Sequence, residues 1–423
     1  MSTSGGWGAS LAPLRERGFA WYFASRTSNT LGSMMASIAL AFAVLDVSDS
    51  ASALGQVLAA RTVPMVVLLL FGGVIADRLP RAAVLQVSNV LSALTQGVVA
   101  ALVITGQADL WMLIVLEAAN GTVSAMSFPA MASMVPQLVP RSMLQPANAL
   151  LSMVRAALTV IGPTVGALAV VTVGAGWALA FDALTWLVAA ALLLPVRREV
   201  RATPAPGHGS GTLADLRDGW TFFRRTTWLW VVVLAFGVLN AIHAGAWLTL
   251  GPAIAKDTIG AQGWGLVLSA ESAGLLVMTV VLLRVRVRRP LLTGMIGCSL
   301  LSVPIVVLGA EPHLLVLVLA TFVAGAGMEV FGIGWNLAMQ ENIDDAMLSR
   351  AYSYDALGSF VAMPVGQLVY GPLGETFGYR DVLVVSGLTY LVVALSALLS
   401  PSVRRLERVR TVEPVGEPEA VQP

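Results

Sequence analysis

Three glutamates lie inside long apolar stretches of this 423-residue chain. Glu117 lies in LWMLIVLEAANG, Glu271 in VLSAESAGLLV and Glu329 in FVAGAGMEVFG. A carboxyl group held away from water resists ionisation, so a change in its surroundings can make it bind or release a proton. It can also balance the charge of a bound cation. We therefore expect proton exchange or charge compensation from these residues.

The rest of the composition places these carboxyl groups in a membrane. The chain is 57% hydrophobic and 12% charged, and its mean hydropathy is +0.80, which a soluble protein of this length cannot cover with polar surface. The net charge of +1 argues against nucleic acid as a partner. The one cysteine, Cys298, gives no disulfide framework and no cysteine metal site. The first seventeen residues lack the apolar core of a cleaved signal peptide.

Twelve stretches are long and apolar enough to cross a bilayer as helices, which takes about 20 residues each. They run over residues 18–45, 54–76, 82–105, 110–135, 144–172, 176–195, 228–255, 263–283, 291–309, 313–339, 348–375 and 379–400. Charged side chains at mid-membrane cost about 2.5–3.5 kcal/mol each, so each one needs a partner or a water-filled cavity. Glu329 lies nearest the middle of its stretch and is the first candidate for proton coupling, followed by Glu117 and Glu271.

Arginines mark alternate ends of these stretches. They occur in the N-terminal tail, in the connections after the second, sixth and eighth stretches, and in the C-terminal tail, whereas the connections on the opposite side carry only Lys256 and Arg380. Basic residues gather on the cytoplasmic side of membrane proteins. We therefore expect a multi-pass protein of the cell membrane with both termini and the central connection in the cytoplasm.

The two halves of the chain repeat each other. LTWLVAAALLLP begins at Leu184 and LTYLVVALSALL begins 204 positions later, at Leu388, and Gly162 and Gly366 show the same spacing. An even number of spans per half gives both halves one orientation, as in transporters built from parallel repeats. We expect a tail over 1–17, a six-helix bundle over 18–195, a cytoplasmic linker over 196–227, a second bundle over 228–400 and a disordered tail over 401–423.

The linker combines two kinds of sequence. RATPAPGHGSG is typical of a flexible connection. Leu213, Leu216, Trp220 and Phe223 then recur at helical spacing. This pattern predicts an amphipathic helix, either lying on the inner leaflet or packed as a cap against a bundle.

The stretch GGVIADRLPR at residues 72–81 lies in the turn between the second and third spans. It resembles the signature G-x-L-x-D-R-x-G-R of the major facilitator superfamily, with Ile75 in place of Leu and Pro80 in place of the second Gly. The residues that match are Gly73, Asp77, Arg78 and Arg81. The resemblance covers the whole chain and implies two pseudo-symmetric six-helix bundles that alternate around a central site.

This turn has a physical interpretation as a conformational latch. Gly73 allows close approach of a neighbouring helix. Asp77 is suited to the positive N-terminal end of a helix from the other half, and Arg78 and Arg81 can pair with carboxylates across the same seam. The alternative is that the arginines only obey the positive-inside rule.

Two further comparisons concern the first bundle. IGPTVGAL at residues 161–168 resembles the G-P-x-x-G-G signature of exporters that exchange substrate for protons, with matches at Gly162, Pro163 and Gly166. Proline bends a span and glycine lets helices cross closely. The fourth span departs from the R-x-x-Q-G pattern of drug exporters, since Glu117 stands where Arg is usual. Three other segments are most similar to the branch of siderophore and macrolide exporters: PAMASMVPQLVP from Pro129, DALTWLVAAALL after Phe181 and the segment through SRAYSYDALGS.

The resemblance implies that spans 1, 4, 7 and 10 line a central cavity. Polar and aromatic residues on these spans suit an amphipathic ligand, although they can equally bond neighbouring helices or anchor span ends. These substrate-cavity candidates are Arg26, Asn29, Asn120, Asn240, His243, Trp247, Trp335 and Asn336. Arg26 can alternatively reach the inner surface.

Three other charges in the spans need partners or water. Arg155 is deep in the fifth span, so we expect it to pair with a carboxylate. Asp355 is a candidate for such a buried pair or for a contact at the cytoplasmic seam. Asp182 lies near the outer end of the sixth span and is expected to be solvated.

The sequence as a whole predicts a secondary transporter rather than an enzyme, because no nucleotide-binding P-loop or catalytic cluster occurs. We expect proton-coupled efflux of amphipathic small molecules of drug, macrolide or siderophore type. The expected partners are the substrate, protons and membrane lipids, with no cofactor and no metal, and the protein is expected to be a monomer. A facilitative transporter, a lipid flippase or a receptor with the same fold stays open.

Overall fold

The computed structural model describes residues 11–76, 81–132, 134–199, 220–282, 284–285 and 287–407. Within these ranges the regular structure is helical, without strands. Twelve helical segments are long and apolar enough to cross a membrane. The prediction of an all-α membrane protein with twelve spans in two bundles is confirmed.

The first six spans form the N-terminal bundle. They are α2 (Arg17–Ser48), α3 (Ala51–Ala76), α4 (Arg81–Ile104), α5 (Leu110–Ala132), α7 (Leu144–Val173) and α8 (Ala175–Glu199). Short turns η1 (Ala12–Arg15), α6 (Val135–Leu138) and η2 (Arg141–Met143) lie before α2 and between α5 and α7. In this bundle α2 packs against α7 and α8, α4 packs against α5 and α8, and α3 packs against α5.

The last six spans form the C-terminal bundle, and three of them are interrupted. Span 7 consists of α10 (Thr227–Ile242), η3 (His243–Leu250) and α11 (Gly251–Asp257), and span 8 is α12 (Gly260–Leu282). Span 9 consists of α13 (Pro290–Ser299) and α14 (Ser302–Ala310), and span 10 is α15 (Leu314–Asn342). Span 11 consists of α16 (Asp345–Phe360) and α17 (Ala362–Phe377); α18 (Tyr379–Ser396) with η4 (Ala397–Leu399) is span 12, and α19 (Pro401–Arg404) follows.

The stretch η3 is a π-helix, which inserts residues into the regular helical ladder. Thr249 Oγ1 donates a hydrogen bond to the carbonyl of Ala244, five residues earlier, at 2.9 Å. Because the turn is wider, the side chains that follow point in directions that a regular helix would not give them. Trp247 lies within this stretch.

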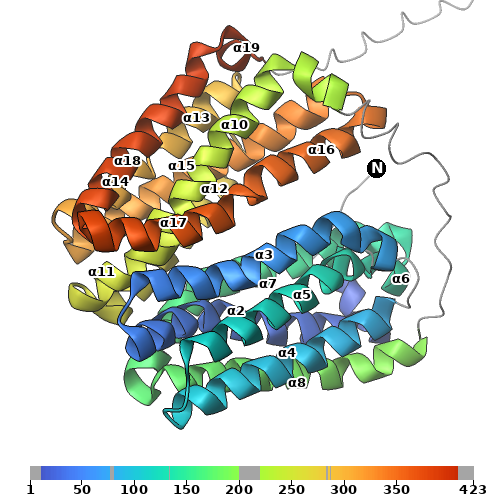
Figure 1. Cartoon of the computed structure of the whole chain (residues 1–423). Coiled ribbons are helices and arrows are strands. Elements are labelled where there is room, and N and C mark those ends of the chain that lie inside the picture. Colours follow the sequence, from blue (N-terminus) through green and yellow to red (C-terminus); the bar gives the residue numbers. More distant parts are fainter. Residues whose placement is uncertain are drawn as a thin grey trace, which may run out of the picture.

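The two bundles repeat one packing scheme (Figure 1). The pair α3 and α5 corresponds to α12 and α15, and the pair α4 and α8 corresponds to α14 and α18. Between the bundles, α7 packs against α12 and α3 packs against α17, which is the same contact with the two halves exchanged.

Glycine contacts show the repeat at the level of single residues. A Cβ on Gly121 would collide with the backbone carbonyl of Arg61, and a Cβ on Gly325 would collide with the backbone carbonyl of Glu271. Gly121 and Gly325 are 204 positions apart, and Arg61 and Glu271 are 210 positions apart. Arg61 and Glu271 therefore occupy equivalent places in the two bundles.

The contact between the bundles repeats in the same way. A Cβ on Gly55 of α3 would collide with the carbonyl of Gln367 of α17, and a Cβ on Gly265 of α12 would lie 2.8 Å from the carbonyl oxygen of Pro163 of α7. These two glycines let the backbones of the two bundles touch. Only residues without a side chain fit between helices at this separation.

The bundles meet at one end of the molecule, where α2 leads into α3, which we call the α2–α3 end. Figure 1 shows α11 and α17 beside α2 and α3 at this end, while the ribbons diverge toward the end where the chain enters α2, the N-terminal end. Ser50 Oγ donates a hydrogen bond to Glu375 Oε1 at 2.7 Å, and Thr164 Oγ1 and Ser269 Oγ are 2.7 Å apart. These contacts all lie in the half of the molecule nearer the α2–α3 end.

Most of the predicted linker helix lies outside the described residues. Trp220 to Arg225 are helical, and Trp220 packs on Phe223 and on Tyr354 of α16, with ring centroids 5.7 and 5.9 Å apart. Phe223 is buried. This part of the linker therefore contacts the C-terminal bundle, as the cap arrangement requires.

Candidate functional site

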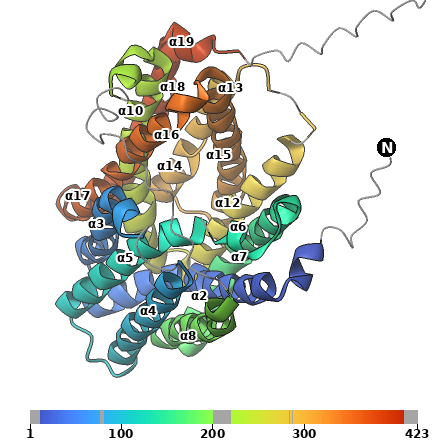
Figure 2. The same cartoon turned by 90° about the vertical axis from the view of Figure 1, so that its right-hand side faces the viewer.

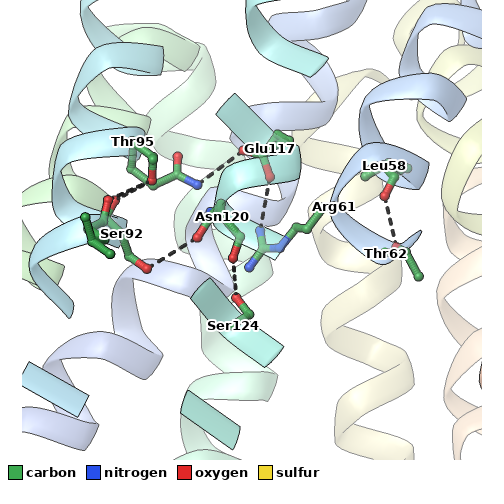
Figure 3. Close-up of polar contacts among 10 residues, drawn as sticks. Leu58, Arg61, Thr62, Ser92, Thr95, Glu117, Asn120 and Ser124 are labelled. Carbon is green, nitrogen blue, oxygen red and sulfur yellow. Dashed lines mark hydrogen bonds and ion pairs between the residues drawn. The ribbon is translucent and has the colours of Figure 1, made fainter. Parts of the chain in front are cut away.

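The N-terminal bundle encloses an ion pair. Glu117 on α5 has no solvent-exposed surface, and its Oε2 lies 3.7 Å from a guanidinium nitrogen of Arg61 on α3. Gln96 on α4 donates a hydrogen bond from Nε2 to Glu117 Oε1 at 3.3 Å. Figure 3 shows the Arg61 guanidinium reaching toward the Glu117 carboxylate, with Asn120 one turn further along α5. The side chain of Arg61 is 36% exposed, so the pair connects a buried carboxylate to accessible space.

A second buried carboxylate belongs to the same electrostatic cluster. Asp182 on α8 is 1% exposed and interacts electrostatically with both Arg61 and Glu117. Its Oδ1 lies 2.5 Å from the position that a Cβ on Gly32 of α2 would take. The expectation that Asp182 is solvated is wrong, because Gly32 leaves room for the carboxylate between α2 and α8. Arg61 forms an ion pair with Glu117, and Asp182 lies near enough to be affected by the charges of both.

Neutral polar side chains extend this cluster across the bundle. Ser92 Oγ donates to Asn120 Oδ1 at 3.3 Å, and Asn29 Nδ2 donates to Asn89 Oδ1 at 3.5 Å. Four of the buried polar atoms without a hydrogen-bond partner among the described residues belong to this cluster: Glu117 Oε2, Gln96 Oε1, Asn120 Nδ2 and Asp182 Oδ1. Buried polar atoms without partners are rare in folded proteins and are explained by water, an ion or a functional role. The cluster is therefore the strongest candidate for a site that exchanges protons.

The other two glutamates lie in the C-terminal bundle. Glu271 on α12 is half-buried, and its Oε2 accepts a hydrogen bond from Trp247 Nε1 at 3.2 Å. Glu329 on α15 is half-buried, and its Oε1 accepts a hydrogen bond from Thr279 Oγ1 at 2.7 Å. No ion pair to either residue occurs within the described residues. The three glutamates thus divide between the two bundles, each with its own local partners.

Several residues expected to line a central cavity are instead buried inside the bundles. Trp247 lies in the π-helical stretch, is fully buried and packs against Trp264, with ring centroids 4.9 Å apart. Asn29 and Asn120 are 6% and 1% exposed and hydrogen-bond within the N-terminal bundle. Trp335 is 7% exposed and donates to Asp355 Oδ2 at 3.0 Å. These four side chains are buried inside the bundles in this conformation.

The remaining cavity candidates are more accessible. Asn240 is half-buried and donates a hydrogen bond to the carbonyl of Ser359 at 3.3 Å. His243 is half-buried, and its Nε2 has no hydrogen-bond partner within the described residues. Asn336 is exposed and bonds to Gly332 and Tyr352. Arg26 lines a pocket formed by residues of α2, α5, α6 and α7.

The expected pairing of buried charges is not present. Asp355 hydrogen-bonds to Trp335 and to Ser359 Oγ, the latter at 3.4 Å. Arg155 lines the same pocket as Arg26 and has no ion pair within the described residues. The predicted carboxylate partner of Arg155 is thus absent from the described residues, and the charged group near Arg155 is another arginine, Arg26.

The two sequence motifs have different outcomes. Asp77 and Arg78 of the expected latch lie outside the described residues, while Gly73 lies in the last turn of α3 and Arg81 begins α4. In the α7 motif, a Cβ on Gly166 would lie 2.8 Å from the backbone of Met35 on α2, and a Cβ on Gly162 would collide with Met34. These glycines allow α7 to cross α2 closely. The backbone carbonyl of Pro163 lies close to Gly265 of α12, where no side chain is in the way.

Known proteins are similar to this chain over almost its full length. Residues 8–419 match the family described as transmembrane secretion effector. The uncharacterized MFS-type transporter YfiS of Bacillus subtilis (strain 168) is 22% identical over 412 residues, covering 93% of this chain and 95% of that protein. The multidrug efflux pump Tap of Mycolicibacterium fortuitum is 25% identical over 407 residues, covering 91% and 96%.

Solved structures show the same fold. A mutant of the nucleoside transporter NupG has a TM-score of 0.73 at 12% identity and covers 90% of this chain and 99% of its own. A bacterial homolog of the human lysosomal transporter Spinster, inward-facing and occupied, has a TM-score of 0.68 at 12% identity and covers 92% and 96%. With twelve spans, two repeated bundles and a family match over residues 8–419, the chain belongs to the transmembrane secretion effector family of major facilitator transporters.

Proposed function

We propose that this protein exports amphipathic small molecules from the cytoplasm in exchange for protons, by alternating access between its two bundles. It acts as a monomer in the cell membrane, with the N-terminal end of the bundles facing the cytoplasm. The similarity to the multidrug efflux pump Tap supports the direction of transport. The arginines at the N-terminal end support the orientation.

The observation that carries the proposal is the buried cluster around Arg61. Glu117 is fully buried beside a guanidinium at 3.7 Å, and its Oε2 has no hydrogen-bond partner within the described residues. Protonation of Glu117 removes the charge that attracts Arg61, so the arginine is then free to move toward Asp182 or toward accessible space. A proton can in this way change the contacts between α3, α5 and α8.

The conformation of the molecule fits one state of such a cycle. The bundles touch near the α2–α3 end through Ser50, Glu375, Thr164 and Ser269, and they diverge toward the N-terminal end (Figure 1). With the proposed orientation this is an inward-facing state, and inward-facing structures occur among the proteins of similar fold. Substrate would enter this state from the cytoplasm.

Inverted membrane vesicles test the proposal. An imposed gradient with an acidic interior should drive accumulation of a fluorescent amphipath from a panel containing ethidium, Nile red and anilinonaphthalene sulfonate. An uncoupler should abolish the accumulation. Glu117→Gln should abolish uphill accumulation and keep exchange of labelled for unlabelled compound, because the carboxylate is needed for coupling and not for the fold.

The matched control is Glu311→Gln, which removes an exposed carboxylate in the connection between α14 and α15. It should leave accumulation unchanged. Gradient-independent equilibration in the wild type would contradict proton coupling and indicate a facilitative transporter. Translocation of a labelled lipid head group, with no accumulation of any panel member, would indicate a flippase.

A further inference from the structure

A pocket of about 300 Å³ lies within the N-terminal bundle and is separate from the Arg61 cluster. Side chains from α2, α5, α6 and α7 line it. This volume is at the lower end of the range for small-molecule sites, about 300–1,000 Å³. Figure 2 shows α2, α6 and α7 lying together on the side of this bundle that faces the C-terminal half.

Two arginines dominate the charge of this pocket. Arg26 comes from α2 and Arg155 from α7, and their positive charges repel each other. Neither forms an ion pair with any carboxylate in the described part of the chain. Two neighbouring cations without a counter-ion are unfavourable within a membrane span, and an anion between them would relieve the repulsion.

The rest of the lining is amphipathic. Thr27 and Thr30 line the pocket and donate their hydroxyl hydrogens to carbonyls one turn earlier on α2, so their oxygens remain available as acceptors. Met131, Val135 and Leu151 supply apolar surface. A ligand that fits this lining has an anionic head group beside the arginines and an apolar body beside the three aliphatic side chains.

The position of the pocket allows entry from the N-terminal end. Arg26 is nine residues into α2 and Arg155 eleven residues into α7, so at 1.5 Å per residue both lie about 14–17 Å from the N-terminal ends of their helices. The hydrogen bonds that Ser50 and Thr164 form with the other bundle lie toward the opposite end. A pocket at this depth is open to a substrate in the proposed inward-facing state.

We propose that this pocket is the substrate site for an amphipathic small-molecule anion, with Arg26 and Arg155 binding a carboxylate, sulfonate or phosphate group. The proposal rests on the export function above and names its substrate class. The acidic residues of the spans would by themselves suggest a cationic substrate. Glu117 and Asp182, however, are enclosed within the bundle, whereas the two arginines line the pocket.

Three ligands with the same apolar body test the assignment. Naphthylacetate, naphthylacetamide and naphthylethylamine are titrated into the purified full-length protein by isothermal titration calorimetry. Hydrogen bonds to charged groups contribute about 1.5–3 kcal/mol, so the acid should bind at least about tenfold more tightly than the amide. The amine should bind more weakly than the amide, because it adds a third positive charge.

Arginine variants identify the groups responsible. Arg26→Gln and Arg155→Gln should each reduce the preference for the acid, and the double variant should remove it. Arg26→Lys should retain part of the preference, since it keeps the charge and loses only the planar fork. Arg380→Gln, at an exposed position of α18, is the matched control and should bind all three ligands as the wild type does.

Other results would overturn the assignment. It is wrong if the wild type binds the acid no more tightly than the amide, or if the preference survives in the double variant. It is also wrong if short-chain phosphatidylglycerol binds in an Arg26-dependent manner and naphthylacetate does not, since the pocket would then hold a lipid head group. Acid-selective binding without pH-driven accumulation in vesicles would refute proton-coupled export and leave the pocket assignment standing.

Discussion

Lys256 of α11 reaches across to two aspartates of the other bundle. Its Nζ lies 3.2 Å from Asp46 Oδ1 and 3.2 Å from Asp49 Oδ1, and it donates a hydrogen bond to the carbonyl of Leu45 at 2.9 Å. Lys256 is the sole lysine of the chain. Together with the bonds from Ser50 and Ser52 to Glu375, it ties the bundles at the α2–α3 end.

Removing the ion pairs of Lys256 with Asp46 and Asp49 should favour separation of the bundles at the α2–α3 end. Exposed ion pairs contribute about 0.2–1 kcal/mol each, so losing two of them in Lys256→Gln should raise the open population by about two- to thirtyfold. A cysteine introduced as Thr164→Cys reports the change, because it lies in the seam between α7 and α12. Its reaction with a membrane-impermeant maleimide should accelerate by the same factor.

The control for this experiment is Arg289→Gln, which removes an ion pair between Arg289 and Glu407 within the C-terminal half. It should leave the labelling rate unchanged. Equal rates in Lys256→Gln and the wild type would show that the ion pairs do not hold the seam.

The Arg61 cluster predicts an asymmetric response to charge removal. Arg61→Gln leaves Glu117 and Asp182 buried without a cation, and breaking a buried pair in this way costs about 3–5 kcal/mol. Glu117→Gln should cost much less, because Arg61 is partly exposed and keeps Asp182 as a partner. Thermal unfolding of the purified protein should therefore show a large loss for Arg61→Gln and a small one for Glu117→Gln.

The double variant Arg61→Gln with Glu117→Gln completes the cycle. It should be more stable than Arg61→Gln alone, because one of the two uncompensated carboxylates is gone. Additive losses in the double variant would mean that the two residues do not interact.

The glycines of α5 and α15 should be intolerant of a methyl group. Gly121→Ala places a Cβ against the carbonyl of Arg61, and Gly325→Ala places one against the carbonyl of Glu271. Backbone cannot move aside as a flexible side chain can, so both variants should unfold at lower temperature. Gly332→Ala on α15 is the control, because its Cβ would meet nothing within 4 Å.

In the control variant Gly332→Ala, the alanine should stabilise helix α15 itself. Alanine is favoured over glycine in helices by about 0.5–1 kcal/mol, so Gly332→Ala should unfold at the wild-type temperature or above it. A similar loss of stability in all three alanine variants would show that the close contacts are not the cause.

The seam glycine Gly265 should affect the conformational equilibrium rather than the stability of either bundle. A Cβ there would lie 2.8 Å from the carbonyl oxygen of Pro163 and would collide with Ala167. Gly265→Ala should therefore weaken the contact between α12 and α7 and increase maleimide labelling at Thr164→Cys, which lies in this seam. Gly237→Ala, whose Cβ would lie 3.3 Å from the carbonyl of Gly358 within the C-terminal bundle, should not increase it.

The fold could be predicted from the sequence because the bilayer imposes a simple rule. Every spanning stretch must be long and apolar, and each of the twelve predicted stretches corresponds to a span in the structure. The repeat was visible as well, since LTWLVAAALLLP and LTYLVVALSALL share letters at an offset of 204. The equivalence of Arg61 and Glu271 was not visible, because opposite charges at a different offset share nothing in sequence.

The orientation of side chains was the part that the sequence could not supply. Spans that are apolar on every side carry no stripe that marks an inward face, so Trp247 and Asn120 could not be assigned to the core rather than to a cavity. The burial of Asp182 depends on the absence of a side chain at Gly32, on another helix. The sequence predicts that Arg155 pairs with a carboxylate. Only the packing of α7 beside α2 shows that Arg155 lines the same pocket as Arg26.

The backbone contacts of Gly55 with Gln367 and of Gly265 with Pro163 would constrain the motion of the two bundles for as long as both contacts persist. Two rigid bodies that keep touching at two points can only turn about the line that joins those points. Such a hinge has a single degree of freedom, so opening the bundles at the α2–α3 end must close them at the N-terminal end. Simultaneous opening to both sides of the membrane would dissipate a gradient. It would require at least one of these two backbone contacts to break.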